Sequence, residues 1–367
     1  MDTSLSLARG PAAPAPATPI AGTSTLRLAD DKVMLRAAAD LTRDLVKPRP
    51  AIYWGDLIAS AVVGYGALVV AATATSIPLA IVAGIVSMLG LYRGLSFIHE
   101  VSHMKHAAVP RFRAGWNALF GVPMLTPSFM YEGVHNLHHA KTRYGTIEDP
   151  EYLPLALMKP WTLPLFIVVS ALAPIALLVR FAVLAPLSLL SPTLRTAVVE
   201  RFSALAINPQ FRRRSPEGEA KVYWNRVEVL ASIWAIALIA LTVSGVLPLR
   251  AFLTFLGVTS AAAVVNQVRT LVAHLWENDG EPMTVTAQYL DTVNVPPPAL
   301  LPALWAPVGL RYHALHHLLP GLPYHALGEA HRRISAELDA MSPYHKASYP
   351  GLPGLVNKIV RSTMASR

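Results

Sequence analysis

Five long apolar runs constrain the fold of this chain more than any other feature. They cover about residues 53–75, 78–98, 161–191, 227–248 and 252–275. A helix needs roughly 20 residues to cross a bilayer, and each run is about that long or longer. Backbone polar groups in lipid must find partners within their own segment, which an α-helix provides. Only 14% of the residues are charged, against roughly 25% in soluble domains. The sequence therefore predicts an all-α integral membrane protein.

The spacing of the runs predicts four transmembrane helices in two hairpins. Only "TATSIP", which holds no charge, separates the first two runs, and only "PLRA" separates the last two. The middle run, 161–191, contains Pro164, Pro174 and Pro186 together with Arg180. These residues favour an interfacial or re-entrant helix over a regular span. On this interpretation the middle run crosses the membrane either not at all or twice.

Basic residues predict the orientation in the membrane. Lys and Arg are concentrated in residues 26–50 and 195–226, and such segments stay on the cytoplasmic side. We therefore expect a multi-pass protein whose active site lies on the cytoplasmic side. The formal net charge of +9 fits Lys and Arg retained beside anionic lipid, so we expect no nucleic-acid partner.

The same patterns divide the chain into four parts. Residues 1–25 are rich in Ala and Pro and are expected to form a disordered tail. A basic cytosolic segment, 26–50, precedes the membrane domain, 51–340. Residues 341–367 are expected to form a C-terminal cytosolic tail.

Three histidine-rich motifs accompany the apolar runs. They are "HEVSH" with His99 and His103, "HNLHH" with His135, His138 and His139, and "HALHH" with His313, His316 and His317. With 13 His in the chain, chance predicts about 0.02 copies of His-x-x-His-His, so two copies are a specific signal. Positions i, i+3 and i+4 share a face of a helix, and each motif can thus offer its imidazoles to one place. We expect the motifs to form a metal site.

The number of histidines argues against a zinc protease. The first motif alone matches His-Glu-x-x-His, in which Glu100 would be the hydrolytic base. A catalytic zinc ion, however, uses three protein ligands, which would leave the other two motifs idle. Eight histidines instead indicate two metal ions. The chain has no Cys, which excludes thiolate ligands, and nitrogen-rich sites suit iron, copper, nickel or zinc. A transporter is disfavoured as well, because the motifs lie beyond the apolar runs rather than within them.

In motif order, spacing and position relative to the apolar runs, residues of about 50–335 resemble the membrane fatty-acid desaturase and hydroxylase superfamily. The resemblance implies a non-haem di-iron centre with nine histidine ligands, on a cytosolic cap over four transmembrane helices. It also implies O₂ as co-substrate and two externally supplied electrons. Eight ligands are the motif histidines. The ninth would be His274 in "LVAHLWEND", at the end of the last run; His106 is the other candidate.

Further residues are expected to orient the ligands from outside the metal shell. These candidates are Glu100, His106, Asp149, Asn266, Thr270, Glu277 and Asp279. Acyl-CoA desaturases of the family carry an Asn one helical turn before the ninth histidine, where it holds a metal-bound water. Here that position is Thr270, and Asn266 lies two turns back. The resting coordination of one iron could therefore differ from that of those enzymes.

The resemblance implies an O₂-dependent oxidoreductase that introduces a C=C bond into a fatty-acyl lipid taken from the bilayer. The alternative is a hydroxylase or ketolase of a fatty acid, sphingolipid, alkane or carotenoid, because the spacing of the motifs cannot separate the two outcomes. The sequence shows no haem-binding domain, flavin motif or Cys cluster. We therefore expect a separate electron donor of the ferredoxin or cytochrome type, and basic residues on the cap favour an acidic one.

Overall fold

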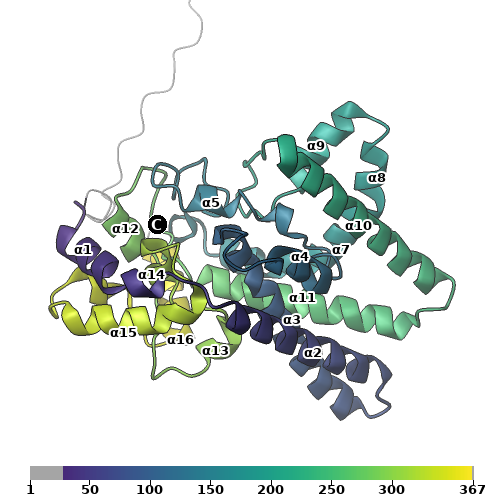
Figure 1. The fold of residues 1–367 in the computed structure, drawn as a ribbon, viewed down its shortest axis with the longest axis horizontal. Helices are drawn as coiled ribbons and strands as arrows, with labels where there is room; N and C mark the ends of the chain where they lie inside the picture. Colours follow the sequence, from purple (N-terminus) through teal and green to yellow (C-terminus); the bar gives the residue numbers. More distant parts are fainter. Residues whose placement is uncertain (1–27, 366–367) are drawn as a thin grey trace, which may run out of the picture.

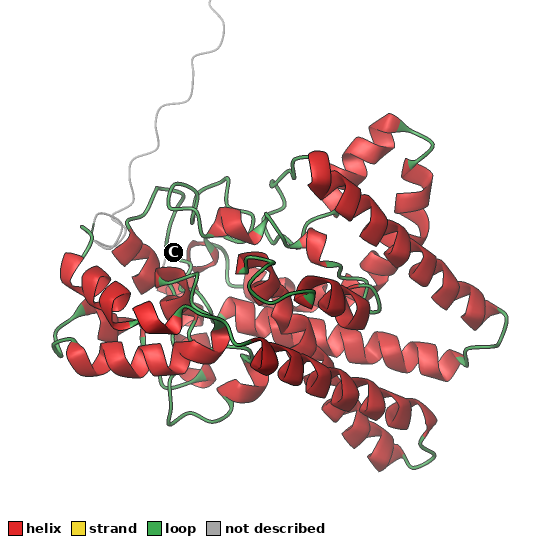
Figure 2. Ribbon diagram, viewed as in Figure 1, coloured by secondary structure: helices red, strands yellow, loops and turns green. Residues whose placement is uncertain are grey.

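In a computed structural model, residues 28–365 are described, and their regular structure is entirely helical (Figure 2). This confirms the all-α prediction for that part of the chain. The tail predicted for residues 1–25 lies outside the described residues.

Five helices are long and apolar enough to cross a membrane. They are α2 (Pro50–Thr73), α3 (Ile77–His103), the composite helix Thr162–Ser188, α10 (Gly218–Val243) and α11 (Leu249–Leu271). Their positions match the five apolar runs, and they fit a multi-pass membrane protein. Figure 1 shows the turns of the α2–α3 and α10–α11 hairpins pointing away from the rest of the molecule. The expected number of four spans stays a prediction, because the composite helix also meets the length and hydropathy requirements.

Two glycines allow α2 and α3 to pack closely. A Cβ atom added to Gly90 would lie 2.8 Å from the Cα atom of Gly64, and one added to Gly64 would lie 2.7 Å from the side chain of Leu91. Small residues let helix backbones approach in this way, which is a common mode of packing in lipid. The hairpin thereby fixes the direction in which α3 leads to the first histidine motif.

The composite helix changes its hydrogen-bonding pattern along its length. Its parts are α6 (Thr162–Val168), η5 (Val169–Leu172), α7 (Ala173–Val179), η6 (Arg180–Leu184) and α8 (Ala185–Ser188). Proline lacks an N–H and interrupts the regular ladder, and three prolines lie in this stretch. The buried guanidinium of Arg180 lies 2.5 Å from Glu228 of α10, and Arg195 lies 2.7 Å from the other oxygen of the same carboxylate. These ion pairs attach the composite helix and the following α9 (Pro192–Phe202) to α10.

Most of the remaining α-helices, several of them short, gather at one end of the spans (Figure 1). We call this part the cap; its helices are α1 (Lys32–Leu41), α5 (His135–His138), α12 (Val285–Asp291), α13 (Pro302–Trp305), α14 (His313–Leu318), α15 (Leu327–Glu337) and α16 (Leu352–Ala365). Short elements connect the helices: η1 (Arg43–Leu45), α4 (Phe112–Trp116), η2 (Asn117–Gly121), η3 (Ser128–Met130), η4 (Leu155–Leu157), η7 (Tyr324–Ala326) and η8 (Pro343–Ala347).

The two ends of the described chain pack into the cap. Met34 and Ala38 of α1 belong to the same core cluster as Ile334 of α15. Leu355 and Ile359 of α16 lie in a second cluster that also contains residues of the Tyr144 region. Both terminal helices thus contribute to the core of the cap, and the four-part division of the chain stays a prediction.

Candidate metal centre

Nine histidines from four parts of the chain meet inside the cap. Because α3 continues beyond its apolar part to His103, it carries His99 and His103 out of the span. The second motif forms the short helix α5, the third forms α14, and His274 follows the end of α11. The expected ligands are thus all brought together, including His274, which lies far from the motifs in sequence.

The histidines form two groups. The first group is His99, His103, His135, His139 and His316, and the second is His138, His274, His313 and His317. Within each group, one ring nitrogen of every residue lies within 4.8 Å of the corresponding atoms of the others. Two metal sites, rather than one, are therefore compatible with the geometry.

Each motif divides between the two groups in a regular way. Histidines four apart stay together: His99 with His103, and His135 with His139, in the first group. The histidine at the intermediate i+3 position, such as His138, joins the other group. The expectation that one motif would direct all its imidazoles to one place was therefore wrong for the second and third motifs. Consecutive helical residues point about 100° apart, so neighbours such as His138 and His139 can serve different sites.

The Nε2 atoms that face one another within each group are better suited to bind a metal than to hydrogen-bond to each other. The Nε2 atom of His316 lies 3.0 Å from that of His103 and 3.1 Å from that of His139. In the second group, Nε2 of His313 lies 3.0 Å from Nε2 of His274 and 3.2 Å from that of His317. A neutral imidazole has one donor and one acceptor nitrogen, so such clusters of Nε2 atoms cannot all be paired by protons. Among the described residues, buried His99 Nε2 has no hydrogen-bond partner.

Burial also keeps these rings in the form that binds metal. It is the largest cause that lowers the pKa of six histidines, and repulsion from neighbouring histidines adds to it. These six are His135, His139, His274, His313, His316 and His317. Metal binding requires the neutral imidazole. His138 differs from these six, because Asp149 raises its pKa against the effect of burial. The set of nine buried or half-buried imidazoles, without thiolate, suits two first-row transition-metal ions.

Carboxylates orient two of the α5 histidines from outside. Both oxygens of buried Asp149 lie 2.9–3.0 Å from Nδ1 of His138. Glu151 accepts at 2.8 Å from Nδ1 of His135, and its other oxygen accepts from the hydroxyl of Tyr131. A hydrogen bond at Nδ1 fixes the tautomer and leaves Nε2 free for a metal. Asp149 therefore occupies the position expected for an orienting residue.

A tyrosine connects His274 to a buried carboxylate. The hydroxyl of Tyr144 lies 2.9 Å from Nδ1 of His274 and donates at 2.7 Å to Asp291. Tyr152 donates to the same carboxylate oxygen, and burial raises the pKa of Asp291 to about 7. This arrangement orients His274 through a tyrosine, with Asp291 in the role that we expected of Glu277 or Asp279.

Other expected orienting residues lie elsewhere. Glu277 contacts Asp291 through its own backbone amide at 3.3 Å, and Asp279 is exposed. The side chain of His106 is 55% exposed and lies 3.9 Å from Glu132. It belongs to neither histidine group.

Glu100, Asn266 and Thr270 lie near the centre with other partners. Glu100 is buried and accepts from the hydroxyl of Tyr53 and from the amide of Tyr324, while its second oxygen is 3.9 Å from His99 Nδ1. Thr270 donates to the carbonyl of Asn266 at 2.9 Å. The Asn266 side chain accepts from Arg269.

Sequence reasoning missed Glu151, Asp291, Tyr131 and Tyr144. Glu151 lies two residues after Asp149 in the acidic stretch "TIEDPEY", which could have indicated it. Asp291 has no such signal, because only the folding of α12 brings it near His274.

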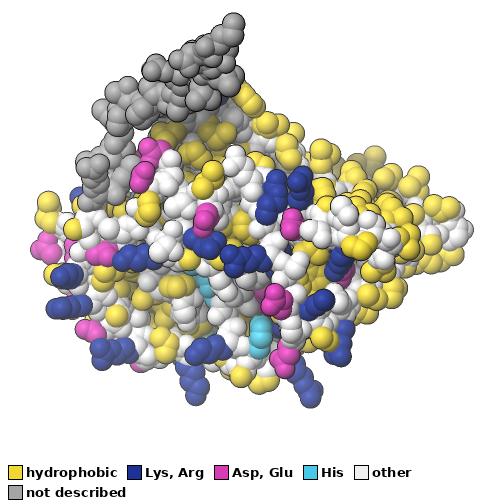
Figure 3. All heavy atoms as spheres, turned by 90° about the horizontal axis from the view of Figure 1, so that it is seen from above, with side chains coloured by type: hydrophobic (Ala, Val, Ile, Leu, Met, Phe, Trp, Pro, Cys, Tyr) yellow, Lys and Arg dark blue, Asp and Glu magenta, His cyan; other side chains and the backbone are white. Residues whose placement is uncertain are grey.

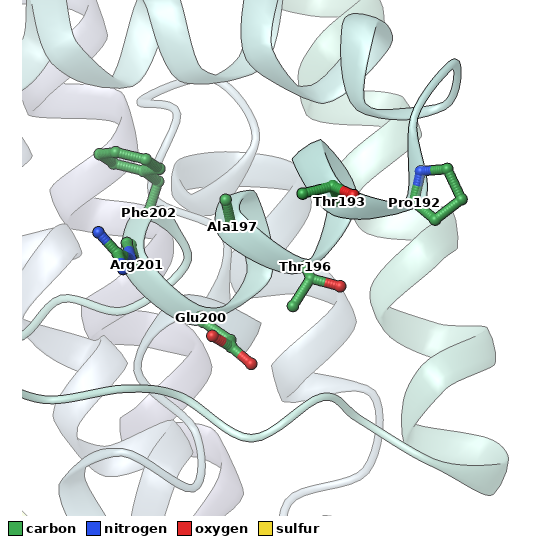
Figure 4. Close-up of a pocket in the computed structure, with 7 residues that line it drawn as sticks. All are labelled: Pro192, Thr193, Thr196, Ala197, Glu200, Arg201 and Phe202. Atoms are coloured by element: carbon green, nitrogen blue, oxygen red, sulfur yellow. The ribbon is translucent and has the colours of Figure 1, made fainter.

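The surface hollow beside α9 is separate from the metal centre. Figure 4 shows its seven lining residues, all between Pro192 and Phe202. Since none of them is a histidine or touches the two groups, this hollow does not extend the candidate site.

Two comparisons with known proteins bear on this site. The family model described as fatty acid desaturase matches residues 72–349. A protein named ceramide hydroxylase, from Caulobacter vibrioides (strain NA1000 / CB15N), is 52% identical over 326 residues, which cover 89% of this chain and 93% of that protein. The second finding favours oxygen insertion, the alternative outcome considered from the sequence, over the desaturation that was our main expectation.

Proposed function

Because the chain belongs to the fatty acid desaturase family, we propose that it is an O₂-dependent lipid hydroxylase with a non-haem di-iron centre. The observation that carries the choice of hydroxylation is the 52% identity to a ceramide hydroxylase along nearly the whole of both chains. We propose the same class of substrate here, an N-acylated long-chain base taken from the bilayer.

The first histidine group would hold one iron with five nitrogen ligands, and the second group would hold the other with four. When bound, the irons would use O₂, two electrons and two protons to convert a C–H bond into C–OH and release water. The protein's own contribution is to hold the ligands. Asp149, Glu151 and the pair Tyr144–Asp291 fix ring orientations through Nδ1, and seven of the nine histidines are buried away from bulk water.

Lipid mass spectrometry tests the proposed reaction. The chain is expressed in a host that makes ceramide, beside a variant with His138→Ala. We expect a new ceramide sixteen mass units heavier with the wild-type chain and none with the variant, since oxygen insertion adds one oxygen atom. A ceramide two mass units lighter would instead indicate desaturation and contradict the proposal.

In the proposed topology, the cap and both termini lie on the cytosolic side, and four regular helices span the membrane. The composite helix begins and ends on the cytosolic side. This topology is supported by Arg and Lys in residues 195–226 and by the breaks in the composite helix. Figure 3 shows Lys and Arg around the visible histidines, and hydrophobic side chains at the tapering end of the molecule. A reporter fused after residue 200 should read cytosolic; a signal from the opposite side would contradict this topology.

A separate acidic protein is proposed as the electron donor. His103 and His139 are only half-buried, so the first group lies nearer the surface than the second. Exposed Lys105 and Lys141 follow these two histidines by two positions, which favours an acidic partner. Turnover supported by an acidic ferredoxin should slow as salt increases, whereas a rate insensitive to salt would argue against this docking surface.

A further inference from the structure

Arg269 lies next to the metal centre and, among the described residues, forms no ion pair with a carboxylate. It lies in the last turn of α11, five residues before His274. Its Nη2 atom donates to Asn266 at 3.0 Å, and its side chain also interacts with the hydroxyl of Tyr92. The buried Nε atom has no hydrogen-bond partner among residues 28–365. A guanidinium that is partly removed from water is costly unless its donors are satisfied, so a further partner is expected.

Several other arginines near the spans are paired with carboxylates. Arg180 binds Glu228, Arg93 binds Asp56, and Arg113 binds Glu132. These residues have structural partners that account for their charge. Arg269 differs from them, because in the described part of the chain it forms no ion pair with a carboxylate, and its identified partners are a neutral amide and a phenol.

Arg269 lies close to the second histidine group along the chain, because His274 follows the end of the helix that carries it. A lipid group bound to Arg269 would therefore lie near the end of α11, from which His274 follows.

An exposed apolar surface lies next to the end of α11 that carries Arg269. The exposed fractions of Leu300, Leu301 and Leu304 are 82%, 70% and 50%. They lie in α13 and the residues just before it, and α13 contacts α11 (Figure 1). The carbonyl of Trp305, at the end of α13, accepts from the same Tyr92 hydroxyl that lies against Arg269. Exposed leucines next to membrane-spanning helices fit contact with lipid chains, so Arg269 lies beside a surface suited to lipid.

We propose that Arg269 binds the oxygen acceptors at the polar end of the lipid, the amide carbonyl and a neighbouring hydroxyl, and thereby selects the carbon that meets the metal centre. This inference rests on the proposed function. A guanidinium offers several donors in one plane and no acceptor, which complements two neighbouring oxygen atoms. Since Arg269 precedes His274 by only five residues, anchoring there places the oxidised carbon near the polar end of the lipid.

The test compares Arg269→Met and Arg269→Lys with the wild-type chain. Arg226→Met, an exposed position on α10, provides the same change of charge away from the site. Iron content, KM and kcat for a ceramide, and the position of the new hydroxyl are measured for each purified protein in detergent. We expect Arg269→Met to keep its iron and to raise KM about 10- to 100-fold, the effect of losing a hydrogen bond to a charged group. Its product should carry the hydroxyl at several positions, whereas Arg269→Lys should restore part of the affinity and Arg226→Met should behave as wild type.

Three results would overturn the inference. Unchanged KM and product position in Arg269→Met would show that Arg269 does not bind the lipid. Loss of iron from Arg269→Met would show that Arg269 stabilises the metal centre. An equal loss of affinity for a free fatty acid of the same chain length would indicate a carboxylate, rather than amide and hydroxyl oxygens, as the group recognised.

Ceramide binding, measured by the rise in Tm on adding the lipid, separates this inference from the proposed function. Arg269→Met should lose the rise whether or not the protein turns the lipid over. A wild-type chain that binds ceramide through Arg269 but does not oxidise it would contradict the proposed reaction alone. If ceramide does not raise the Tm of the wild-type chain, the inference is overturned.

Discussion

His138 and His139 are adjacent in sequence, yet their rings belong to different histidine groups. The sequence was sufficient to identify all nine histidines that meet in the structure, because the motifs repeat a rare spacing and His274 ends an apolar run. It was not sufficient to divide them between two sites. That division depends on the rotation of α5 and α14 relative to α3, which is set by packing in the cap.

Asp149 offers a direct test of the residues that orient the ligands. Asp149→Asn keeps the size of the side chain but weakens its bond to Nδ1 of His138, so we expect about 10- to 100-fold weaker iron binding. Glu148→Gln is the matched control, because the Glu148 side chain is 64% exposed and, among the described residues, forms an ion pair only with Arg143, which lies outside both groups. Iron titration of both apoproteins measures the effect. Equal iron affinity in the two variants would show that Asp149 does not support the centre.

The ninth ligand is tested by comparing His274→Ala with His106→Ala. His274 is 3% exposed, and its Nε2 atom lies 3.0 Å from that of His313. The side chain of His106 is more than half exposed. We expect the His274 variant to lose iron and turnover, since a metal lacking a ligand binds weakly, and the His106 variant to keep both. The iron content of both purified variants is measured. Loss of iron from the His106 variant but not from the His274 variant would assign His106 as the ligand.

The hairpin of α2 and α3 shows what the sequence could and could not predict about the elements. Hydropathy located both helices, but α3 extends to His103, five residues beyond the apolar run that ended near 98. α10 likewise begins at Gly218, before its apolar run near 227. Polar turns at the ends of spans can stay helical outside the hydrocarbon, and hydropathy does not detect them. The breaks in the composite helix were signalled by its prolines.

Close packing in this hairpin predicts a large difference between two glycines of the same helix. Gly90→Val should lower the Tm in detergent, because the added Cβ atom would meet the backbone of Gly64 at 2.8 Å, and backbone cannot easily move aside. Gly84→Val is the control, since nothing lies within 4 Å of its added Cβ atom, and both changes replace glycine by a β-branched residue within α3. A Tm for Gly90→Val that equals that of Gly84→Val would contradict this packing.

At the scale of the whole molecule, the spans and the cap have separate tasks. The spans hold the apolar surface that fits lipid, while the cap gathers side chains from five parts of the chain around the histidines. Tyr144 and Asp291, for example, come from segments on either side of α10 and α11. Such long-range contacts leave no local pattern in one sequence, which is why Asp291 was not predicted although the metal ligands were.

Labelled oxygen tests the central claim, that a di-iron centre in the cap inserts oxygen into a ceramide-type lipid. The purified, iron-loaded protein is supplied with ceramide, a reducing system and ¹⁸O₂, and a His316→Ala variant, which removes a ligand of the first group, is treated in parallel. We predict a hydroxylated ceramide whose added oxygen is ¹⁸O, formed by the wild-type protein and absent from the variant. Product that carries only ¹⁶O from water, dehydrogenated ceramide without added oxygen, or equal product from the variant would contradict the account.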